Sequence, residues 1–284
     1  MRPSIDLRGR AQRRLEAELD GRSRPLSDEE LRRPALVVAP HHDDETLGCG
    51  GTIARKAAAG TDVAVLFLTD GTASHGGIEP AELAETRRLE AAAAVRALGV
   101  DEYAVFSGDI VDGGLSDHLP EVTDLVRRTL AEVRPTQVFV PHAGDGHADH
   151  LAATTAGIEA AASLGPDIEV LEYPVWHWQQ WPWVGLASPT RRSSWRAGEL
   201  HGDAWRRTVA NRFGLRFPAT LDRVVDIAGT LPQKRAALEA YTSQVDRLGG
   251  PDWPVLADVS FGHFLDRLLG PCEFFRVTRP ARAG

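Results

Sequence analysis

Short apolar runs alternate along this chain with longer segments in which apolar side chains recur every three or four positions. The apolar runs predict β-strands at Ala35–Ala39, Val63–Leu68, Tyr103–Phe106, Gln137–Val140 and Glu169–Val175. The segments between them are rich in Ala, Leu and Glu, and one of them places Val122, Val126 and Leu130 on a single helical face. This alternation is typical of a parallel sheet with crossover helices. We therefore expect an α/β, Rossmann-like three-layer fold with a mostly parallel sheet and a loop-rich C-terminal part.

The pattern changes at both ends of this α/β unit. Residues 1–33 mix Arg with Asp and Glu, and they predict an N-terminal arm or peripheral helix that is most helical over Arg10–Asp20. Residues 34–284 are expected to form one domain, with a last helix around Gln233–Ala240. A Trp-rich insertion or lid is expected near residues 174–205.

Charge and composition narrow the class of partner. The formal net charge of -8 argues against non-specific nucleic-acid binding, which needs clustered Lys and Arg, so a small-molecule substrate is favoured. The two cysteines are too few for a disulfide framework. Neither a secretory signal nor an apolar run long enough for a membrane span is present, so the sequence predicts a cytoplasmic protein. A second copy of the chain is a further potential partner.

Ionisable residues gather directly after two of the predicted strands. The sequence "PHHDDE" follows Ala35–Ala39, and "GDGHADH" follows Gln137–Val140 after a short gap. In an open parallel sheet, ligands bind beyond the carboxyl ends of the strands, so the two clusters are expected to meet. Imidazole and carboxylate groups suit a borderline divalent ion, and a catalytic zinc site uses three protein ligands. The most plausible trio is His41, Asp44 and His150.

A purely structural interpretation of these clusters is the alternative. Acids at a helix start complement the helix dipole without binding a ligand, and Asp43, Asp44 and Glu45 have that placement. Burying several carboxylates without a cation is costly, however, and the pattern occurs at two strand ends. These points favour a metal site. The lower-ranked ligand candidates are His42, His142 and His147.

Both motifs resemble a known family, the PIG-L/LmbE-like zinc-dependent deacetylases of N-acetylglucosaminyl compounds. The family signature is "[AP]-H-x-D-D-E" after the first strand and "G-H-x-D-H" after a later one, matched here by "PHHDDE" and "GHADH". The resemblance implies that the metal is held by His41, Asp44 and His150. It also implies that Asp43 is the general base, that His147 assists the transition state, and that Asp149 orients His147.

The sequence gives fewer indications of the residues that contact the substrate. In the family, residues matching Arg87 and Asp112 contact the sugar, so the resemblance implies the same here. Trp176 and Trp178 lie in a Trp-rich stretch whose indole faces suit stacking on a sugar. A tryptophan-rich packing patch explains this stretch equally well.

The sequence thus predicts a zinc-dependent hydrolase that removes the N-acetyl group from an N-acetylglucosamine-type conjugate, using metal-activated water and an Asp base. Fe²⁺ is the alternative ion. The alternative functions are an amidase acting on another amide, such as a thiol conjugate, and a carbohydrate-binding protein without catalysis. A dinucleotide-binding enzyme is disfavoured, because "GCGGTIA" follows the acidic cluster instead of forming GxGxxG directly after the strand.

Overall fold

The computed structural model describes residues 6–74, 78–185, 204–248, 250 and 253–279. Within these residues one sheet runs in the order β1-β7-β8-β6-β5-β2-β3-β4. Its strands are β1 Arg24–Pro25, β2 Ala35–Ala39, β3 Val63–Thr69, β4 Val105–Ile110, β5 Gln137–Pro141, β6 Glu169–Tyr173, β7 Arg223–Asp226 and β8 Cys272–Thr278. The strands from β6 to β4 are parallel to one another, whereas β8 runs antiparallel to both β6 and β7. The predicted α/β fold with a mostly parallel sheet is confirmed.

Two features of the sheet differ from the prediction. Strand β4 begins at Val105, because Glu102–Ala104 form a 3-10 turn capped by the Asp101 side chain, which accepts the Tyr103 N–H. The C-terminal part also supplies two strands, β7 and β8, that extend the sheet beyond β6.

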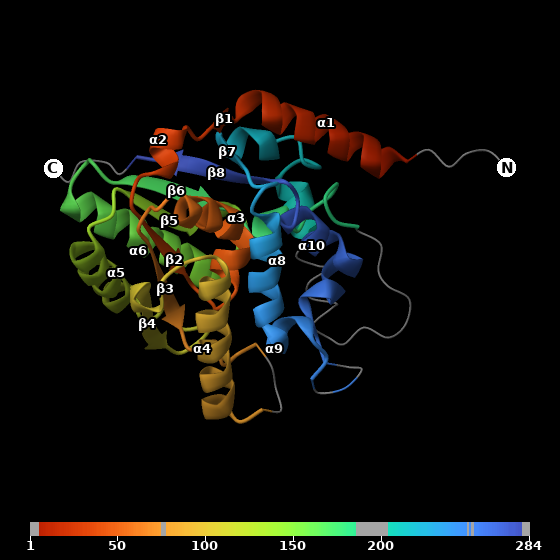
Figure 1. Cartoon of the computed structure of the whole chain (residues 1–284). Helices are drawn as coiled ribbons and strands as arrows, with labels where there is room; N and C mark the ends of the chain where they lie inside the picture. Colours follow the sequence, from red (N-terminus) through yellow and green to blue (C-terminus); the bar gives the residue numbers. More distant parts are fainter. Residues whose placement is uncertain (1–5, 75–77, 186–203, 249, 251–252, 280–284) are drawn as a thin grey trace.

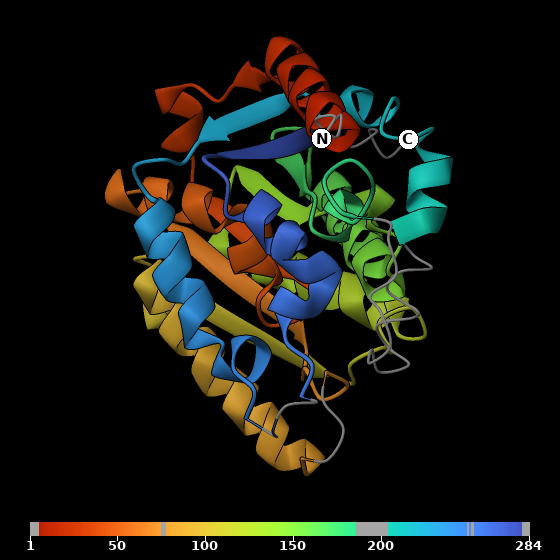
Figure 2. The ribbon, with the colours of Figure 1, turned by 90° about the vertical axis from the view of Figure 1, so that its right-hand side faces the viewer.

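Helices cover both faces of the sheet (Figures 1 and 2). One face packs against α5 and α6, and the other packs mainly against α3, α4 and α8. Side chains of β2 alternate between the two cores, with Leu36 and Val38 on the α5/α6 side and Val37 on the other. The α-helices that lie wholly within the described residues are α1 Leu7–Arg22, α2 Asp28–Leu31, α3 Asp44–Ala58, α4 Pro80–Ala97, α5 Leu119–Val133, α6 Ala148–Leu164, α8 Leu231–Ala240, α9 Thr242–Val245 and α10 His263–Leu268.

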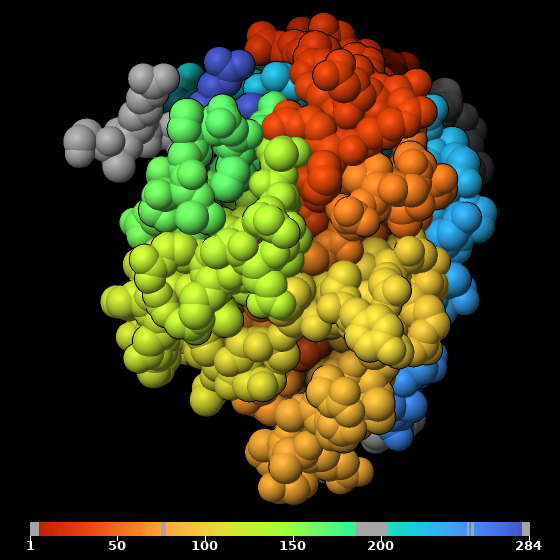
Figure 3. All heavy atoms as spheres, turned by 60° about the vertical axis from the view of Figure 1, so that its left-hand side comes forward, coloured from red at the N-terminus to blue at the C-terminus, as the bar shows by residue number. Residues whose placement is uncertain are grey.

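The N-terminal segment packs against the domain (Figure 3). Helix α1 buries Leu15 and Leu19 in the main core, and β1 pairs with β7 at the edge of the sheet. The predicted division at residue 33 and the predicted lid stay predictions, and residues 186–203 of that lid lie outside the described residues. No helix among the described residues is long and apolar enough to cross a membrane.

Helix α3 is interrupted one turn after its start. Cys49 has a non-helical backbone (φ -145°). Backbone carbonyl and N–H groups on either side of it form hydrogen bonds with side chains from distant elements. The Lys234 Nζ donates to the Leu47 carbonyl oxygen (2.9 Å) and to Glu273 (2.8 Å). The Glu273 carboxylate accepts the backbone N–H groups of Gly51 and Thr52, both at 2.8 Å. This buried ion pair therefore holds the two halves of α3 in place.

The strand order places β2 at a topological switch point. Strand β2 lies between β5 and β3. After β2 the chain continues into α3 on one face of the sheet, and after β5 it continues into α6 on the opposite face. In folds of this kind the loops diverge at such a point, and ligands bind beyond the carboxyl ends of the strands. Both predicted motifs begin in the loops after β2 and β5.

Candidate active site

Three predicted ligands come together at the carboxyl ends of β2 and β5. His41 follows β2, Asp44 opens α3, and His150 lies in the first turn of α6. The Asp44 Oδ2 is 3.2 Å from His41 Nδ1 and 3.2 Å from His150 Nε2, and ligand atoms of all three residues lie within 4.8 Å of one another. These separations are close to the roughly 3.4 Å expected between two ligands of a tetrahedral zinc ion. The His150 Nε2 is buried and, apart from the Asp44 carboxylate, faces no polar partner among the described residues, which fits a nitrogen that binds a metal.

Carboxylates hold the far side of both imidazole rings. The Asp145 Oδ2 is 2.8 Å from His150 Nδ1, and Asp145 also accepts the backbone N–H groups of Val175 and His177. Burial alone would raise the pKa of Asp145, but the hydrogen bond with His150 and the charges of neighbouring histidines lower it. A carboxylate in this position fixes the ring orientation and tautomer of a metal-binding histidine. Asp145 was not among the predicted site residues, because only its contact with His150 reveals its role.

Asp149 contacts a different histidine from the one predicted. Its Oδ2 is 3.2 Å from His41 Nε2, and the carboxylate also accepts the backbone N–H groups of Gly113 and Leu115. Asp112 lies beside it, with Oδ1 also 3.2 Å from His41 Nε2. Within the described residues no hydrogen bond joins Asp149 to His147. Asp149 lies in the first turn of α6, and its carboxylate points toward His41 at the end of β2.

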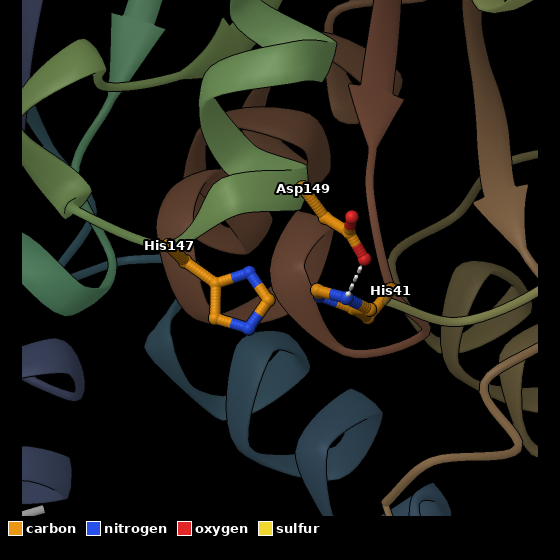
Figure 4. A group of neighbouring side chains, drawn as sticks. All are labelled: His41, His147 and Asp149. Carbon is orange, nitrogen blue, oxygen red and sulfur yellow. Dashed lines mark hydrogen bonds and ion pairs between the residues drawn. The ribbon is translucent and has the colours of Figure 1, made fainter. Parts of the chain in front are cut away.

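His147 completes the group of rings, as Figure 4 shows with His41 and Asp149. Its ring centroid lies 5.1 Å from that of His41 and 5.2 Å from that of His150. Although His147 is partly open to solvent, desolvation by the surrounding atoms and the charges of the neighbouring histidines lower its pKa to about 4. His147, His41 and Asp149 form a second group whose potential ligand atoms lie within 4.8 Å of one another.

Asp43 lies next to these ligands and is 7% exposed. It precedes the first residue of α3, yet its carboxylate makes no capping hydrogen bond with the helix. Burial, together with the Asp44 and Glu45 charges, raises the pKa of Asp43 to about 7, while Arg87 opposes the shift. The Arg87 Nη2 is 3.7 Å from Asp43 Oδ2. A carboxyl group with a pKa near 7 is well suited to accept a proton at neutral pH.

The predicted sugar contacts are mostly buried. Arg87 is 2% exposed and donates to the His42 carbonyl oxygen, and Trp178 is 3% exposed beneath the Arg267 guanidinium (3.7 Å to the ring centroid). Trp176 stacks on Phe264, with ring centroids 5.0 Å apart. Their roles in substrate binding stay predictions.

The remaining ligand candidates have other partners. His42 is buried and stacks on Phe67, with ring centroids 4.8 Å apart. His142 stacks on His177, with centroids 4.5 Å apart. Neither His42 nor His142 belongs to a potential metal-binding group among the described residues.

Comparison with known proteins identifies the family. The model of the PIG-L family, described as GlcNAc-PI de-N-acetylase, matches residues 36–161. A 1D-myo-inositol 2-acetamido-2-deoxy-alpha-D-glucopyranoside deacetylase of Rhodococcus opacus is 33% identical over 244 residues, covering 75% of this chain and 82% of the relative. The chain belongs to the PIG-L family. This confirms the resemblance inferred from the two sequence motifs.

Solved structures of similar proteins agree with the PIG-L fold. A conserved protein of Thermus thermophilus is 30% identical, with a TM-score of 0.54 over 88% of this chain and 96% of its own. An N,N'-diacetylchitobiose deacetylase of Pyrococcus horikoshii has a TM-score of 0.59 at 18% identity, over 99% of this chain and 96% of its own. PIG-L deacetylases are metal-dependent enzymes, and the His and Asp groups described above include two that are able to hold a metal ion.

Proposed function

We propose that this chain is a zinc-dependent hydrolase that removes the N-acetyl group from an N-acetylglucosamine-type amino-sugar conjugate. The observation that carries the proposal is the convergence of His41, Asp44 and His150 beside the buried carboxyl group of Asp43. The Rhodococcus relative is named as a deacetylase of an acetamido sugar linked to inositol, which supports this substrate class.

His41, Asp44 and His150 would hold the metal ion. Two nitrogens and one carboxylate oxygen form a ligand set typical of catalytic zinc, while Fe²⁺ accepts similar ligands. A divalent ion bound there would polarise the acetamide carbonyl and make a water molecule more acidic. The carboxylates of Asp145 and Asp149 keep the two imidazole rings facing Asp44.

The chain's own residues would move the protons. Asp43 accepts the proton of the attacking water, which its raised pKa permits near pH 7. It then returns that proton to the amine nitrogen as the amide bond breaks, releasing acetate. His147 is neutral near pH 7, because its pKa is lowered to about 4, so it assists through a ring N–H instead of a positive charge. The two other histidines beside this ring oppose a positive charge on it.

Replacing the base tests this proposal most directly. Release of free amine from a panel of N-acetylhexosamine conjugates would be followed by mass spectrometry, using zinc-loaded wild type and Asp43→Asn. We expect the variant to retain its metal and to lose about 10²- to 10⁴-fold in kcat, the usual contribution of a general base. Asp109→Asn is the matched control, because it removes an exposed carboxylate at the end of β4 and leaves Asp43 unchanged.

The same panel separates the alternative functions. Equal turnover by wild type and Asp43→Asn would contradict the role of Asp43. Hydrolysis of N-acyl thiol conjugates in preference to amino sugars would favour the alternative amidase, and saturable sugar binding without turnover would favour a carbohydrate-binding protein. A cytoplasmic location and a homo-oligomer stay predictions of the sequence.

A further inference from the structure

The backbone of Asp43 has an unusual conformation. Its φ is 112° and its ψ is -24°, in a region that residues other than glycine rarely adopt. Such a conformation persists only where the surrounding structure determines it. The contacts that hold Asp43 are therefore part of how the site is built.

Two side chains hold the peptide unit between His42 and Asp43, one at each end. The Glu45 Oε2 accepts the Asp43 backbone N–H at 3.2 Å, and Arg87 Nη2 donates a short hydrogen bond to the His42 carbonyl oxygen. These two backbone groups belong to the same planar peptide, so rotation of that plane would break both contacts. The φ angle of Asp43 depends on the orientation of this plane, and so does the direction of its carboxylate.

Tyr241 joins these two side chains. It lies in the turn between α8 and α9, is fully buried, and donates its hydroxyl to Glu45 Oε1 at 2.7 Å. The Arg87 guanidinium carbon is 5.7 Å from the centroid of the Tyr241 ring. Helix α8 lies along α4, which carries Arg87, so one aromatic side chain contacts both groups that hold the peptide (Figure 2).

We propose that Tyr241, acting through Glu45, is a positioning residue that fixes the backbone of Asp43 and so aims its carboxylate in the reaction. Together with the Thr46 hydroxyl, which donates to the same oxygen, the Tyr241 hydroxyl holds the Glu45 carboxylate in the orientation that accepts the Asp43 N–H. The polar contacts of the Tyr241 side chain are with Glu45 and Arg87, so it acts on Asp43 through them. The inference rests on the proposed function of Asp43 as the base.

Tyr241→Phe is the test, because it removes the hydroxyl and leaves the ring beneath Arg87. The matched control is Tyr173→Phe, since Tyr173 is equally buried and donates its hydroxyl to the Val38 carbonyl oxygen at 2.8 Å. Both variants remove one hydroxyl donor from a buried acceptor, so similar losses of stability are expected. We expect Tyr241→Phe to lower kcat about 10-fold, with KM within twofold and metal content unchanged, whereas Tyr173→Phe keeps the wild-type kcat. Equal kcat values in the two variants would overturn the proposal.

Glu45 offers a second, independent comparison. Glu45→Gln retains a side-chain oxygen that is able to accept the Asp43 N–H, whereas Glu45→Ala retains none. We therefore expect kcat of Glu45→Gln to lie closer to the wild-type value than kcat of Glu45→Ala. The opposite order, in two variants that both retain their metal, would contradict the role of Glu45.

Hydrogen exchange tests the backbone contact without relying on turnover. Exchange of the peptide that contains Asp43 would be measured by mass spectrometry in metal-loaded wild type and the two Tyr→Phe variants. Faster exchange in Tyr241→Phe alone is expected, and equal exchange in both variants would contradict the contact. If wild type releases no amine from any substrate, the proposed function fails, and this measurement still decides whether Tyr241 holds the Asp43 backbone.

Discussion

Two pairs of histidines, one member of each contacted by Asp145, differ in their neighbours. In the first pair, His41 and His150 direct their ring nitrogens toward carboxylate oxygens. In the second pair, His142 accepts the Gly144 backbone N–H, and His177 lies near the Gly144 carbonyl and the Thr220 hydroxyl. His150, His142 and His177 are all at most 3% exposed.

Their pKa values shift in opposite directions despite the similar burial. Burial lowers the pKa of His150, but the Asp44 and Asp145 carboxylates outweigh it and raise the value to about 9. Burial and the His142 charge lower the pKa of His177 to about 3. The comparison teaches that converging carboxylates, not the number of histidines, distinguish a potential cation site from a packed pair of rings.

Removing a ligand should give the largest difference between the two pairs. We expect Asp44→Asn and His150→Gln to weaken zinc binding by more than about 100-fold, beyond the loss usual for an outer contact. His142→Asn should bind zinc with wild-type affinity, because its ring contacts no potential ligand. Isothermal titration and elemental analysis of dialysed protein would measure both, and weakened binding in His142→Asn would place His142 in the metal site.

Removing the carboxylate shared by the two pairs should have a smaller effect. Asp145→Asn keeps an oxygen for the Val175 and His177 N–H groups but loses the charge beside His150. We expect zinc affinity to fall about 10- to 100-fold. Glu172→Gln is the matched control, since Glu172 is a buried carboxylate that accepts the Ala143 N–H. Equal affinities in the two variants would show that Asp145 contributes no more than packing.

The stacked pair, His142 and His177, should instead lower the free energy of unfolding at acid pH. This is the smallest of the three expected effects. The folded-state pKa of His177 is about 3, below the unfolded value near 6.5, so its contribution is fully present above pH 6.5. That contribution is lost progressively as the pH falls from 6.5 toward 3. Between pH 7 and pH 5 we expect this one group to lower the free energy of unfolding by about 2 kcal/mol. Urea unfolding of wild type and His177→Gln at both pH values would measure it, and parallel losses in the two proteins would exclude His177 as the cause.

The sequence predicts the centre of the sheet well and its edge poorly. Strands β2, β3 and β5 are buried along their whole length and therefore appear as apolar runs with a polar residue at most at one end. Strand β8 carries Glu273 and Arg276 within its apolar residues, and β7 has only four residues. Both become strands by pairing antiparallel with each other, which no local pattern indicates.

The active site likewise has features that the sequence predicts and features that it does not. The trio His41, Asp44 and His150 is predictable, because each residue lies in a motif that directly follows β2 or β5. The Glu45–Tyr241 hydrogen bond joins residues 196 positions apart, and the partner of Asp149 depends on how α6 packs against the end of β2. Contacts of this kind arise from tertiary packing, so the spacing of residues within a motif does not reveal them.

The interruption in α3 has a consequence for the order in which the protein is made. The Glu273 carboxylate that binds the backbone after Cys49 lies 222 residues beyond Gly51. A ribosome synthesises both sequence motifs long before it reaches that residue, and contacts of such long range form slowly. The nascent chain therefore carries every predicted metal ligand well before the residue that supports α3 has been synthesised.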